Sequence, residues 1–291
     1  MSQFGQLFLS LRPHQWTKNL VVLAALVFAQ RLFDGPSVLV ASGALVIFCL
    51  LSGAVYLVND LADLEQDRKH PVKRNRPLAA GKLSPRLATG AAVVLVTGGL
   101  VAAYWLAPGF GVVATIYFAT MTAYSFILKN IVILDVLIVA FGFVLRAVAG
   151  ALAIDVVFSN WLLICTLLAA LFLALAKRRQ ELTLLASGAA EHRKILGEYS
   201  PYLLDQMIAV VTASTLVSYA LYTLAPETVA KFGTDKLTWT LPFVLYGIFR
   251  YLYLVHQKEE GGDPTKVLLN DRPILVTVAL WAATIVTLIY H

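Results

Sequence analysis

The sequence predicts an all-α, polytopic membrane protein, and three observations carry that prediction. Hydrophobic residues make up 59% of the 291 residues and charged residues only 14%, a composition that a water-soluble domain of this size could hardly keep in solution. Apolar stretches long enough to cross a bilayer as helices recur along the whole chain. Lys and Arg residues gather in alternate connecting segments, which is typical of a multi-pass protein.

Nine transmembrane helices are expected, because about 20 helical residues cross a hydrocarbon core about 30 Å thick. They are predicted at residues 19–33, 37–58, 87–107, 109–128, 131–154, 157–176, 202–225, 237–256 and 273–290. The first span is short, and the long side chains of Lys18 and Arg31 at its ends would have to reach opposite interfaces. It does not resemble a cleaved signal peptide, since Gln30, Arg31 and Asp34 stand where a cleavage site needs small residues. Residues 1–291 are expected to form a single membrane domain.

The basic residues also predict the orientation of the chain. With a cytoplasmic amino terminus, most of the 23 Lys and Arg residues lie on the cytoplasmic side. The opposite side receives only Arg31, Lys231 and Lys236. The positive-inside rule therefore predicts a multi-pass protein of the cell inner (plasma) membrane, with the polar loops 59–86 and 177–201 at the cytoplasmic face. Those two loops are where we expect the chemistry.

Composition excludes several other classes. Cys49 and Cys165 both lie in apolar stretches without His at metal-ligand spacing, so neither a disulfide framework nor a zinc site is indicated. The formal net charge of +6 indicates basic residues that set the membrane topology and bind anionic ligands, rather than a nucleic-acid-binding protein. The 18 Gly and 11 Pro show no period, which excludes a collagen-like or repeat-array protein.

The first polar loop begins with an acidic stripe. If the second span continues as a helix, one face carries Tyr56, Asn59, Asp60, Asp63 and Asp67. Like charges at this spacing repel each other, so a helix gains nothing from them unless a divalent cation binds. Mg²⁺ takes hard oxygen ligands and is typically held by one or two carboxylates, water and phosphate oxygens. The stripe therefore predicts Mg²⁺ held by Asp60, Asp63 and Asp67.

Cations follow the acids directly. They are Arg68, Lys73, Arg74 and Arg76. Such side chains suit phosphate, which Arg can bind through two parallel hydrogen bonds, and Pro71 and Pro77 are expected to end the helix and shape the loop. A solvated loop of mixed charge is the alternative interpretation. The separation of acids from bases favours a metal-bridged diphosphate over that alternative.

These residues resemble the first aspartate-rich motif of the UbiA superfamily of intramembrane prenyltransferases. The chain reads N-D-x-x-D-x-x-x-D from Asn59 to Asp67, and then D-R-x-H-P-x-K-R-x-R-P-x-A-x-G from Asp67 to Gly81. The resemblance covers essentially the whole chain. It implies nine helices surrounding a central cavity, with active-site loops on the cytoplasmic side.

The second polar loop departs from the pattern of typical superfamily members. Members that transfer a prenyl group from its diphosphate to an aromatic acceptor carry a D-x-x-x-D cluster at the end of the sixth helix. Here no Asp occurs between Asp155 and Asp205, and the corresponding place reads A-L-A-K-R-R-Q-E-L, with Lys177, Arg178 and Glu181. Cations would hold a second anionic group directly, where carboxylates would need another metal ion.

With this basic cluster in place of the aspartates, the sequence resembles the decaprenyl-phosphate phosphoribosyltransferase branch of the superfamily. The matching segments are R-P-H-Q-W-T-K-N at 12–19, Y-S-F-I-L-K at 124–129, L-D-V at 134–136, V-L-R-A-V-A-G at 144–150, K-R-R-Q-E-L at 177–182 and G-D-P-T…D-R-P at 262–273. The resemblance implies Mg²⁺-dependent transfer of 5-phosphoribose from phosphoribosyl pyrophosphate to a polyprenyl (decaprenyl-type) phosphate lipid. Pyrophosphate is released, on the route to arabinose donors for cell-wall polymers. The membrane bilayer is the implied setting, and a homo-oligomer is compatible with it.

The implied mechanism divides the basic residues between two phosphate-bearing partners. Besides the catalytic, metal-binding aspartates, the expected substrate-binding residues are Lys18, Asn59, Arg68, Lys73, Arg74, Arg76, Tyr124, Lys129, Arg146, Lys177, Arg178 and Glu181. The group that follows the acidic stripe would hold the pyrophosphate or 5-phosphate, while Lys177, Arg178 and Arg146 would take the lipid phosphate, and these roles are interchangeable. A lipid phosphate oxygen attacks an oxocarbenium-like anomeric carbon from the face opposite the leaving group, which predicts inversion.

Several of these residues have structural alternatives. Arg146 lies inside the fifth span, where an Arg normally faces a polar cavity or a partner; the alternative is an ion pair, although Asp135 is about 16 Å away along one helix. Lys18 has the alternative of an interface anchor beside Trp16. Tyr124 and Lys129 are equally consistent with an interfacial belt. Lys177 and Glu181 stand at i and i+4, which also suits a plain helix salt bridge. All of these alternatives remain open at this level.

Two competing functions are compatible with parts of the sequence. A UbiA-type prenyltransferase that uses an isoprenyl diphosphate donor and an aromatic or other acceptor would explain the first motif, and the missing second aspartate cluster argues against it. A non-catalytic lipid-binding or transport membrane protein would explain the spans, and it leaves the acidic stripe unexplained.

Overall fold

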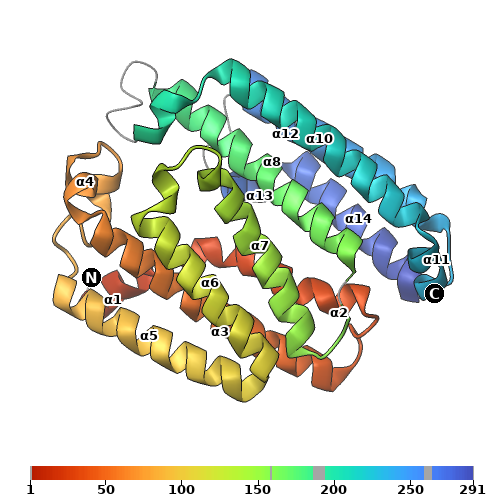
Figure 1. Ribbon diagram of the computed structural model, residues 1–291, viewed down its shortest axis with the longest axis horizontal. Coiled ribbons are helices and arrows are strands. Elements are labelled where there is room, and N and C mark those ends of the chain that lie inside the picture. Colours follow the sequence, from red (N-terminus) through yellow and green to blue (C-terminus); the bar gives the residue numbers. More distant parts are fainter. Residues whose placement is uncertain (1, 158, 186–193, 259–263, 291) are drawn as a thin grey trace. The chain divides into compact units, whose positions relative to one another are not determined.

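The computed structural model of the chain is helical, and it describes residues 2–157, 159–185, 194–258 and 264–290 (Figure 1). The α-helices are α1 (Gln3–Ser10), α2 (Ala24–Phe28), α3 (Gly35–Ala62), α4 (Leu64–Lys69), α5 (Pro85–Leu106), α6 (Pro108–Phe126), α7 (Leu134–Ala153), α8 (Asn160–Leu185), α10 (Pro201–Leu224), α11 (Pro226–Phe232), α12 (Leu241–Gln257), α13 (Pro264–Asn270) and α14 (Arg272–Tyr290). Short 3₁₀ segments join them: η1 (Pro13–Leu23), η2 (Lys73–Asn75), η3 (Leu128–Asn130), η5 (Lys194–Glu198) and η6 (Lys236–Thr240). No strand occurs in those four ranges, so the predicted all-α class is confirmed.

Seven helices are long and apolar enough to cross a membrane within the residues that the structure describes. They lie at residues 35–62, 85–106, 108–126, 134–153, 160–183, 201–224 and 272–290. The predicted count of nine is therefore not confirmed. The region of the eighth predicted span contains α12, which has 17 residues and carries Arg250. Its buried contacts include Tyr251, whose ring packs against that of Phe172 in α8.

The first predicted span, 19–33, is not confirmed as a membrane helix. Its residues belong to the 3₁₀ segment η1 and to α2, which has only five residues. Asn19, 1% exposed, faces the protein interior, where its amide forms hydrogen bonds with buried polar groups of other helices.

Proline and a polar cap mark the beginnings of several helices. Asp34 precedes α3, and its carboxylate accepts hydrogen bonds from the backbone N–H (3.2 Å) and the hydroxyl of Ser37. The hydrogen bond from the Ser37 hydroxyl, outside the membrane-spanning part, lowers the pKa of Asp34. Ser200 caps α10 in the same manner by accepting from Leu203 at 3.1 Å. Pro in the first turn suits both helices, because the N–H that Pro lacks has no helical partner there.

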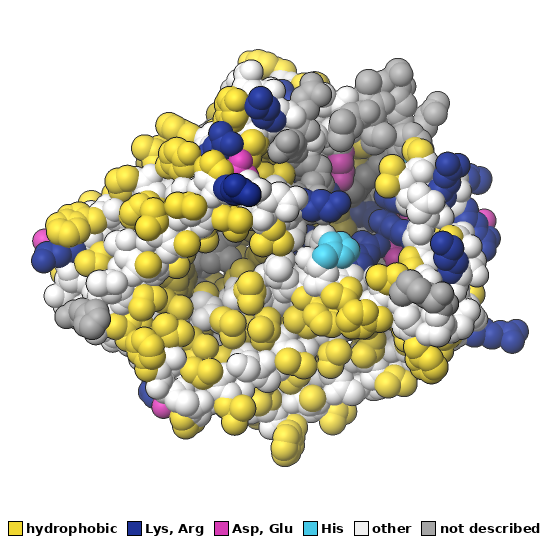
Figure 2. Space-filling view, turned by 180° about the vertical axis from the view of Figure 1, so that it is seen from behind, with side chains coloured by type: hydrophobic (Ala, Val, Ile, Leu, Met, Phe, Trp, Pro, Cys, Tyr) yellow, Lys and Arg dark blue, Asp and Glu magenta, His cyan; other side chains and the backbone are white. Residues whose placement is uncertain are grey.

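The chain forms two compact units. The first contains residues 1–138 and 142–157, and the second contains residues 139–141 and 158–291. Whether they act as the one domain that the sequence predicts stays a prediction. Hydrophobic side chains make up much of the face drawn in Figure 2, where the Lys and Arg side chains form separate clusters, as expected for a protein whose surface largely meets lipid.

The core of the first unit forms where α3 packs against α5 and α6. The ring of Phe48 in α3 lies 5.1 Å from that of Tyr117 and 5.7 Å from that of Phe110, both in α6. All three side chains are at most 2% exposed. Aromatic rings at these separations interact favourably beyond the area that they bury, so this cluster holds α3 in place and with it the acidic stripe.

In the second unit α8 packs along α10, and α12 along α14. Helix α8 continues to Leu185, so the basic cluster that begins at Lys177 lies on a helix rather than in an irregular loop. The local sequence explains this, because Lys, Arg, Gln, Glu and Leu are all good helix formers.

Candidate active site

The three aspartates lie around the junction of two helices in the first unit. Helix α3 ends at Ala62, Asp63 stands between the helices, and Asp67 lies on α4. Asp60 and Asp67 are each 2% exposed, while 17% of the Asp63 side chain is exposed. Helix α4 ends before His70, whose backbone is extended ahead of Pro71, as the sequence predicts.

One distant cation and two from the following segment hold the carboxylates of Asp60 and Asp67. Arg12 donates to Asp60 at 2.5 Å. One nitrogen of Arg76, Nη1, donates both to Asp60 at 3.1 Å and to Asp67 at 2.5 Å. Lys73 Nζ lies 4.0 Å from Asp67. Buried carboxylates are costly unless they are paired and hydrogen-bonded, so this arrangement is what allows two of them to lie in the interior.

Asp63 is held separately from the other two aspartates. Lys129, in η3 at the end of α6, donates to it at 2.5 Å. The structure therefore brings Lys129 to the acidic stripe and joins the cytoplasmic ends predicted for α3 and α6. Tyr124 lies in the last turns of α6 and is half-buried, as are Lys18 and Asn59.

The donor set suits a divalent cation only in part. Among the residues that the structure describes, no three His, Cys, Asp or Glu side chains lie close enough together to hold a metal ion. Asp60 and Asp67, however, contact the same nitrogen of Arg76, so they border one small volume. Two carboxylates with phosphate oxygens are a usual Mg²⁺ environment, and these two fit it.

Arg12 is the contact that sequence reasoning missed. It lies just before η1 with a positive φ of 53°, and its guanidinium stands 4.6 Å from the centre of the Tyr56 ring. In the sequence it is one basic residue of a membrane-proximal motif, and only its place within residues 12–19 marked it as more than a topology signal.

Not all of the predicted phosphate ligands turn toward the carboxylates. Arg68 pairs with the exposed Glu65 at 2.7 Å on the outer side of α4. Arg74 is exposed in η2. The side chains of Arg68 and Arg74 are exposed to an incoming anion, whereas Arg76 is half-buried between Asp60 and Asp67.

Arg146 is buried in α7, with 6% of its surface exposed, and its partners are neutral. Its guanidinium donates to the Asn19 side-chain oxygen at 2.7 Å, the Tyr117 hydroxyl at 2.7 Å and the Gly142 carbonyl at 2.9 Å. The ion pair considered for Arg146 and Asp135 does not form. None of the described residues offers Arg146 a carboxylate within ion-pair distance, and the Tyr117 ring, 4.7 Å away, adds a cation–π contact.

This network ties α7 to the amino-terminal segment. Asn19 of η1 accepts from Arg146 and donates to Ser52 of α3 at 3.0 Å. Close packing accompanies these bonds, since a methyl group added at Gly150 would lie 1.9 Å from the carbonyl oxygen of Val22. Arg146 and Gly150 thus position η1, which follows Arg12 directly.

The basic cluster of the second unit lies on α8. Arg178, 5% exposed, forms an ion pair with Glu181, and Lys177 Nζ lies 3.9 Å from the same residue. The helix salt bridge considered for Lys177 and Glu181 is therefore present. Arg179, the next residue after Arg178, donates to Asp205 of α10 at 2.7 Å.

The carboxyl-terminal motif is only partly described. Residues 259–263, which include the first part of G-D-P-T, lie outside the described residues. Beyond them, Asp271 accepts from Arg250 at 2.8 Å, and the hydrogen bonds from Arg250 lower the pKa of Asp271. This pair joins the start of α14 to α12.

Comparison with known proteins agrees with this fold. The family model of the UbiA prenyltransferase family matches residues 19–270. The chain is 35% identical to the decaprenyl-phosphate phosphoribosyltransferase of Mycolicibacterium smegmatis, over 97% of this chain and 91% of that protein. It is also 35% identical to the enzyme of the same name from Corynebacterium glutamicum, over 97% and 86%.

A solved structure shows the same fold. It is a UbiA homolog from Archaeoglobus fulgidus bound to GPP and Mg²⁺, with a TM-score of 0.73, 18% identity and full coverage of both chains. The family match and the seven apolar helices make this a multi-pass membrane protein. The chain belongs to the UbiA prenyltransferase family.

Proposed function

We propose that the protein transfers 5-phosphoribose from phosphoribosyl pyrophosphate to a decaprenyl-type polyprenyl phosphate and releases pyrophosphate. The observation that carries this proposal is the 35% identity, over nearly the whole chain, to enzymes named for that activity. The basic cluster on α8, where typical relatives have a second aspartate cluster, agrees with it. The proposal includes a place in the inner membrane, with the amino terminus in the cytoplasm, and a role in arabinan precursor synthesis for the cell wall.

The ion pairs of the first unit suggest how a charged donor is received. In the protein alone, Arg12 and Arg76 neutralise the buried carboxylates of Asp60 and Asp67. Asp60 and Asp67 would hold the magnesium ion of a bound diphosphate, and the two guanidinium groups would pair with its phosphate oxygens. Each charged group would then keep a charge-assisted partner, so none would be left buried and unpaired. Bound Mg²⁺ supplies charge neutralisation for the departing pyrophosphate.

The remaining groups bind rather than transfer protons. Lys73, with Arg68 and Arg74 at the accessible side, supplies further cations for the phosphates of the donor. Lys177 and Arg178 are proposed for the lipid phosphate. One of its oxygens forms a bond to the anomeric carbon as the bond to pyrophosphate breaks, with inversion at that carbon. The nucleophile is already anionic, so no strong general base is needed.

The test is an assay with purified protein, phosphoribosyl pyrophosphate labelled in the ribose, and a polyprenyl phosphate. We expect label in the organic-extractable lipid, dependent on the acceptor and abolished when Mg²⁺ is chelated. Digestion or mass analysis of the product should show one phosphoribose on each lipid phosphate. If the lipid stays unlabelled while the same preparation consumes an isoprenyl diphosphate, the proposal is wrong and a prenyl transfer replaces it.

A further inference from the structure

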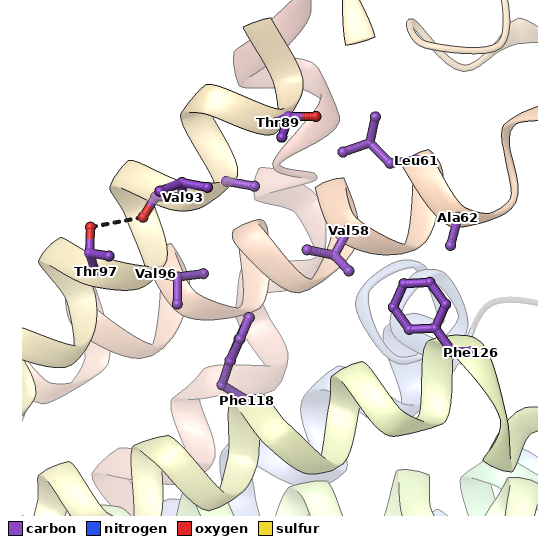
Figure 3. A pocket seen from close by; sticks show the side chains of 10 residues that line it. Val58, Leu61, Ala62, Thr89, Val93, Val96, Thr97, Phe118 and Phe126 are labelled. Carbon is purple, nitrogen blue, oxygen red and sulfur yellow. Dashed lines mark hydrogen bonds between the residues drawn. The ribbon is translucent and has the colours of Figure 1, made fainter. Parts of the chain in front are cut away.

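A groove of about 550 Å³ lies between α3, α5 and α6 of the first unit (Figure 3). Val58 and Leu61 of α3, Val93 of α5 and the rings of Phe118 and Phe126 of α6 line it. Val93 and Phe126 are each 56% exposed, so the groove opens on the surface of the unit. The small side chains on this side of α5 leave room for it.

The lining of the groove consists mostly of apolar side chains, and its few hydroxyl groups already have hydrogen-bond partners. Its two hydroxyl groups are already bound to their own helix, since Thr89 donates to the Pro85 carbonyl at 2.9 Å and Thr97 to the Val93 carbonyl at 2.8 Å. The second of these bonds is drawn in Figure 3. Water in such a groove would find few partners. Hydrocarbon, in contrast, would gain contacts and lose none.

The groove is separate from the candidate active site. Of the α3 residues that line it, Val58 and Ala62 lie about 160° around the helix from Asp60 and Leu61 about 100°. None of the three aspartates is among the lining residues. An occupant of the groove therefore does not contact the carboxylate stripe.

Positive charge lies at one end of the groove. Arg86 shares the helical face of Thr89, Val93 and Thr97, at offsets of three, seven and eleven residues. Arg86 and the nearby Lys82 are exposed, and within the described part of the chain neither comes within ion-pair distance of a carboxylate. From Arg86 to Thr97 the helix rises about 16 Å. The side chain of Arg86 points toward the start of α5, away from the hydrocarbon.

We propose that this groove binds one acyl chain of an anionic phospholipid, whose phosphate contacts Arg86. An open apolar groove, with an exposed cation at its end that has no carboxylate within ion-pair distance among the described residues, matches an amphiphile that carries a negative head and a hydrocarbon tail. Zwitterionic lipids lack the net charge, and free phosphate lacks the tail, so the groove distinguishes anionic phospholipids from both. The lipid binds α3 on the side away from the acids.

The experiment measures lipids retained by the full-length protein in native mass spectrometry after incubation with equal amounts of phosphatidylglycerol and phosphatidylcholine. The main variant is Val93→Trp, which places a large ring in the groove. Its matched control is Val94→Trp, one residue along α5, 68% exposed and outside the lining. We expect Val93→Trp to lower the occupancy of phosphatidylglycerol at least fivefold, and Val94→Trp to leave it unchanged.

The charge is tested by Arg86→Gln, with Lys236→Gln in the second unit as the control. Losing one charge-assisted contact should weaken phosphatidylglycerol binding by about tenfold and abolish the preference over phosphatidylcholine. Gel filtration and thermal unfolding verify that each variant is folded. The proposal is overturned if the wild type and all variants retain phosphatidylglycerol and phosphatidylcholine to the same extent. A rise in KM for polyprenyl phosphate in Val93→Trp without loss of phosphatidylglycerol also overturns it, since the groove would then hold the acceptor chain.

Discussion

The two charged regions of this protein are built in different ways. In the first unit, two aspartates of the stripe pair with cations far away in the sequence: Arg12 and Asp60 are 48 residues apart, and Lys129 and Asp63 are 66 apart. Asp67 pairs with Arg76, nine residues away. On α8, Arg178 pairs with Glu181 three residues away. The first region depends on the fold of the whole unit, whereas the second depends largely on one helix. Substitutions should therefore disturb them to different extents.

The largest effect is expected from Asp67→Asn. The change removes a buried negative charge with which Arg76 and Lys73 form ion pairs. It also removes a proposed metal ligand. We expect phosphoribosyl transfer to fall by at least about 100-fold, which corresponds to about 2.7 kcal/mol. The control is Glu65→Gln on the same helix, whose side chain is 76% exposed. Comparable losses in the two variants would remove the distinction between buried and exposed acids of α4.

Arg12→Gln tests whether the pairing in the first unit serves the donor. Without Arg12, Asp60 keeps only Arg76, and an incoming diphosphate loses one guanidinium. We expect the KM for phosphoribosyl pyrophosphate to rise by about tenfold, with partial rescue in Arg12→Lys. Steady-state kinetics with saturating lipid provides the measurement. An unchanged KM together with a lower unfolding temperature would mean that Arg12 only stabilises the carboxylate.

Gly150→Ala addresses how the first region is positioned. The new methyl group would lie 1.9 Å from the Val22 carbonyl oxygen, so η1 must move. We expect a loss of about 1–3 kcal/mol of stability, seen as a lower unfolding temperature, together with reduced activity. Gly90→Ala is the control, because nothing lies within 4 Å of the added group, and a helical Gly→Ala change should be neutral or stabilising by up to about 1 kcal/mol. Similar behaviour of the two variants would contradict the close packing of η1 on α7.

Arg146→Lys distinguishes a positioning role from a phosphate contact. Lysine keeps the charge, yet it cannot reach Asn19, Tyr117 and Gly142 together. We expect a lower unfolding temperature and a modest fall in kcat, with the KM for the lipid acceptor unchanged. A rise in that KM alone, at wild-type thermal stability, would instead assign Arg146 to the lipid phosphate, as the sequence first suggested.

The smallest effect concerns the Arg250–Asp271 pair in the second unit. Because the folded state lowers the pKa of Asp271 below its value in the unfolded chain, the pair contributes stability above the unfolded pKa and loses it as the pH falls through the folded one. We expect the unfolding temperature of Asp271→Asn to approach that of the wild type at acidic pH and to lie slightly below it near neutrality. If the two unfolding temperatures differ by the same amount at every pH in this range, the ionisation of Asp271 does not contribute to stability.

Local patterns were sufficient for much of this description. The seven apolar helices, the acidic stripe that begins at Asn59 and the end of α4 before Pro71 all follow from spacing along the chain. The helix salt bridge between Lys177 and Glu181 does too. The span 19–33 was not confirmed, since its residues divide between η1 and α2. The hydrogen bonds of Asn19 to Arg146 and Ser52 depend on three packed segments and could not be predicted from spacing.

Apolar periodicity and motif spacing act over a few turns of one helix, so they were enough to identify the helical membrane architecture, the family and the residues that carry charge. The pairing of carboxylates with cations, the neutral partners of Arg146 and the position of the apolar groove became visible only in the folded protein. The physical reason is that ion pairs and cavities depend on distances of a few ångströms between segments far apart in the chain, and packing alone sets those distances.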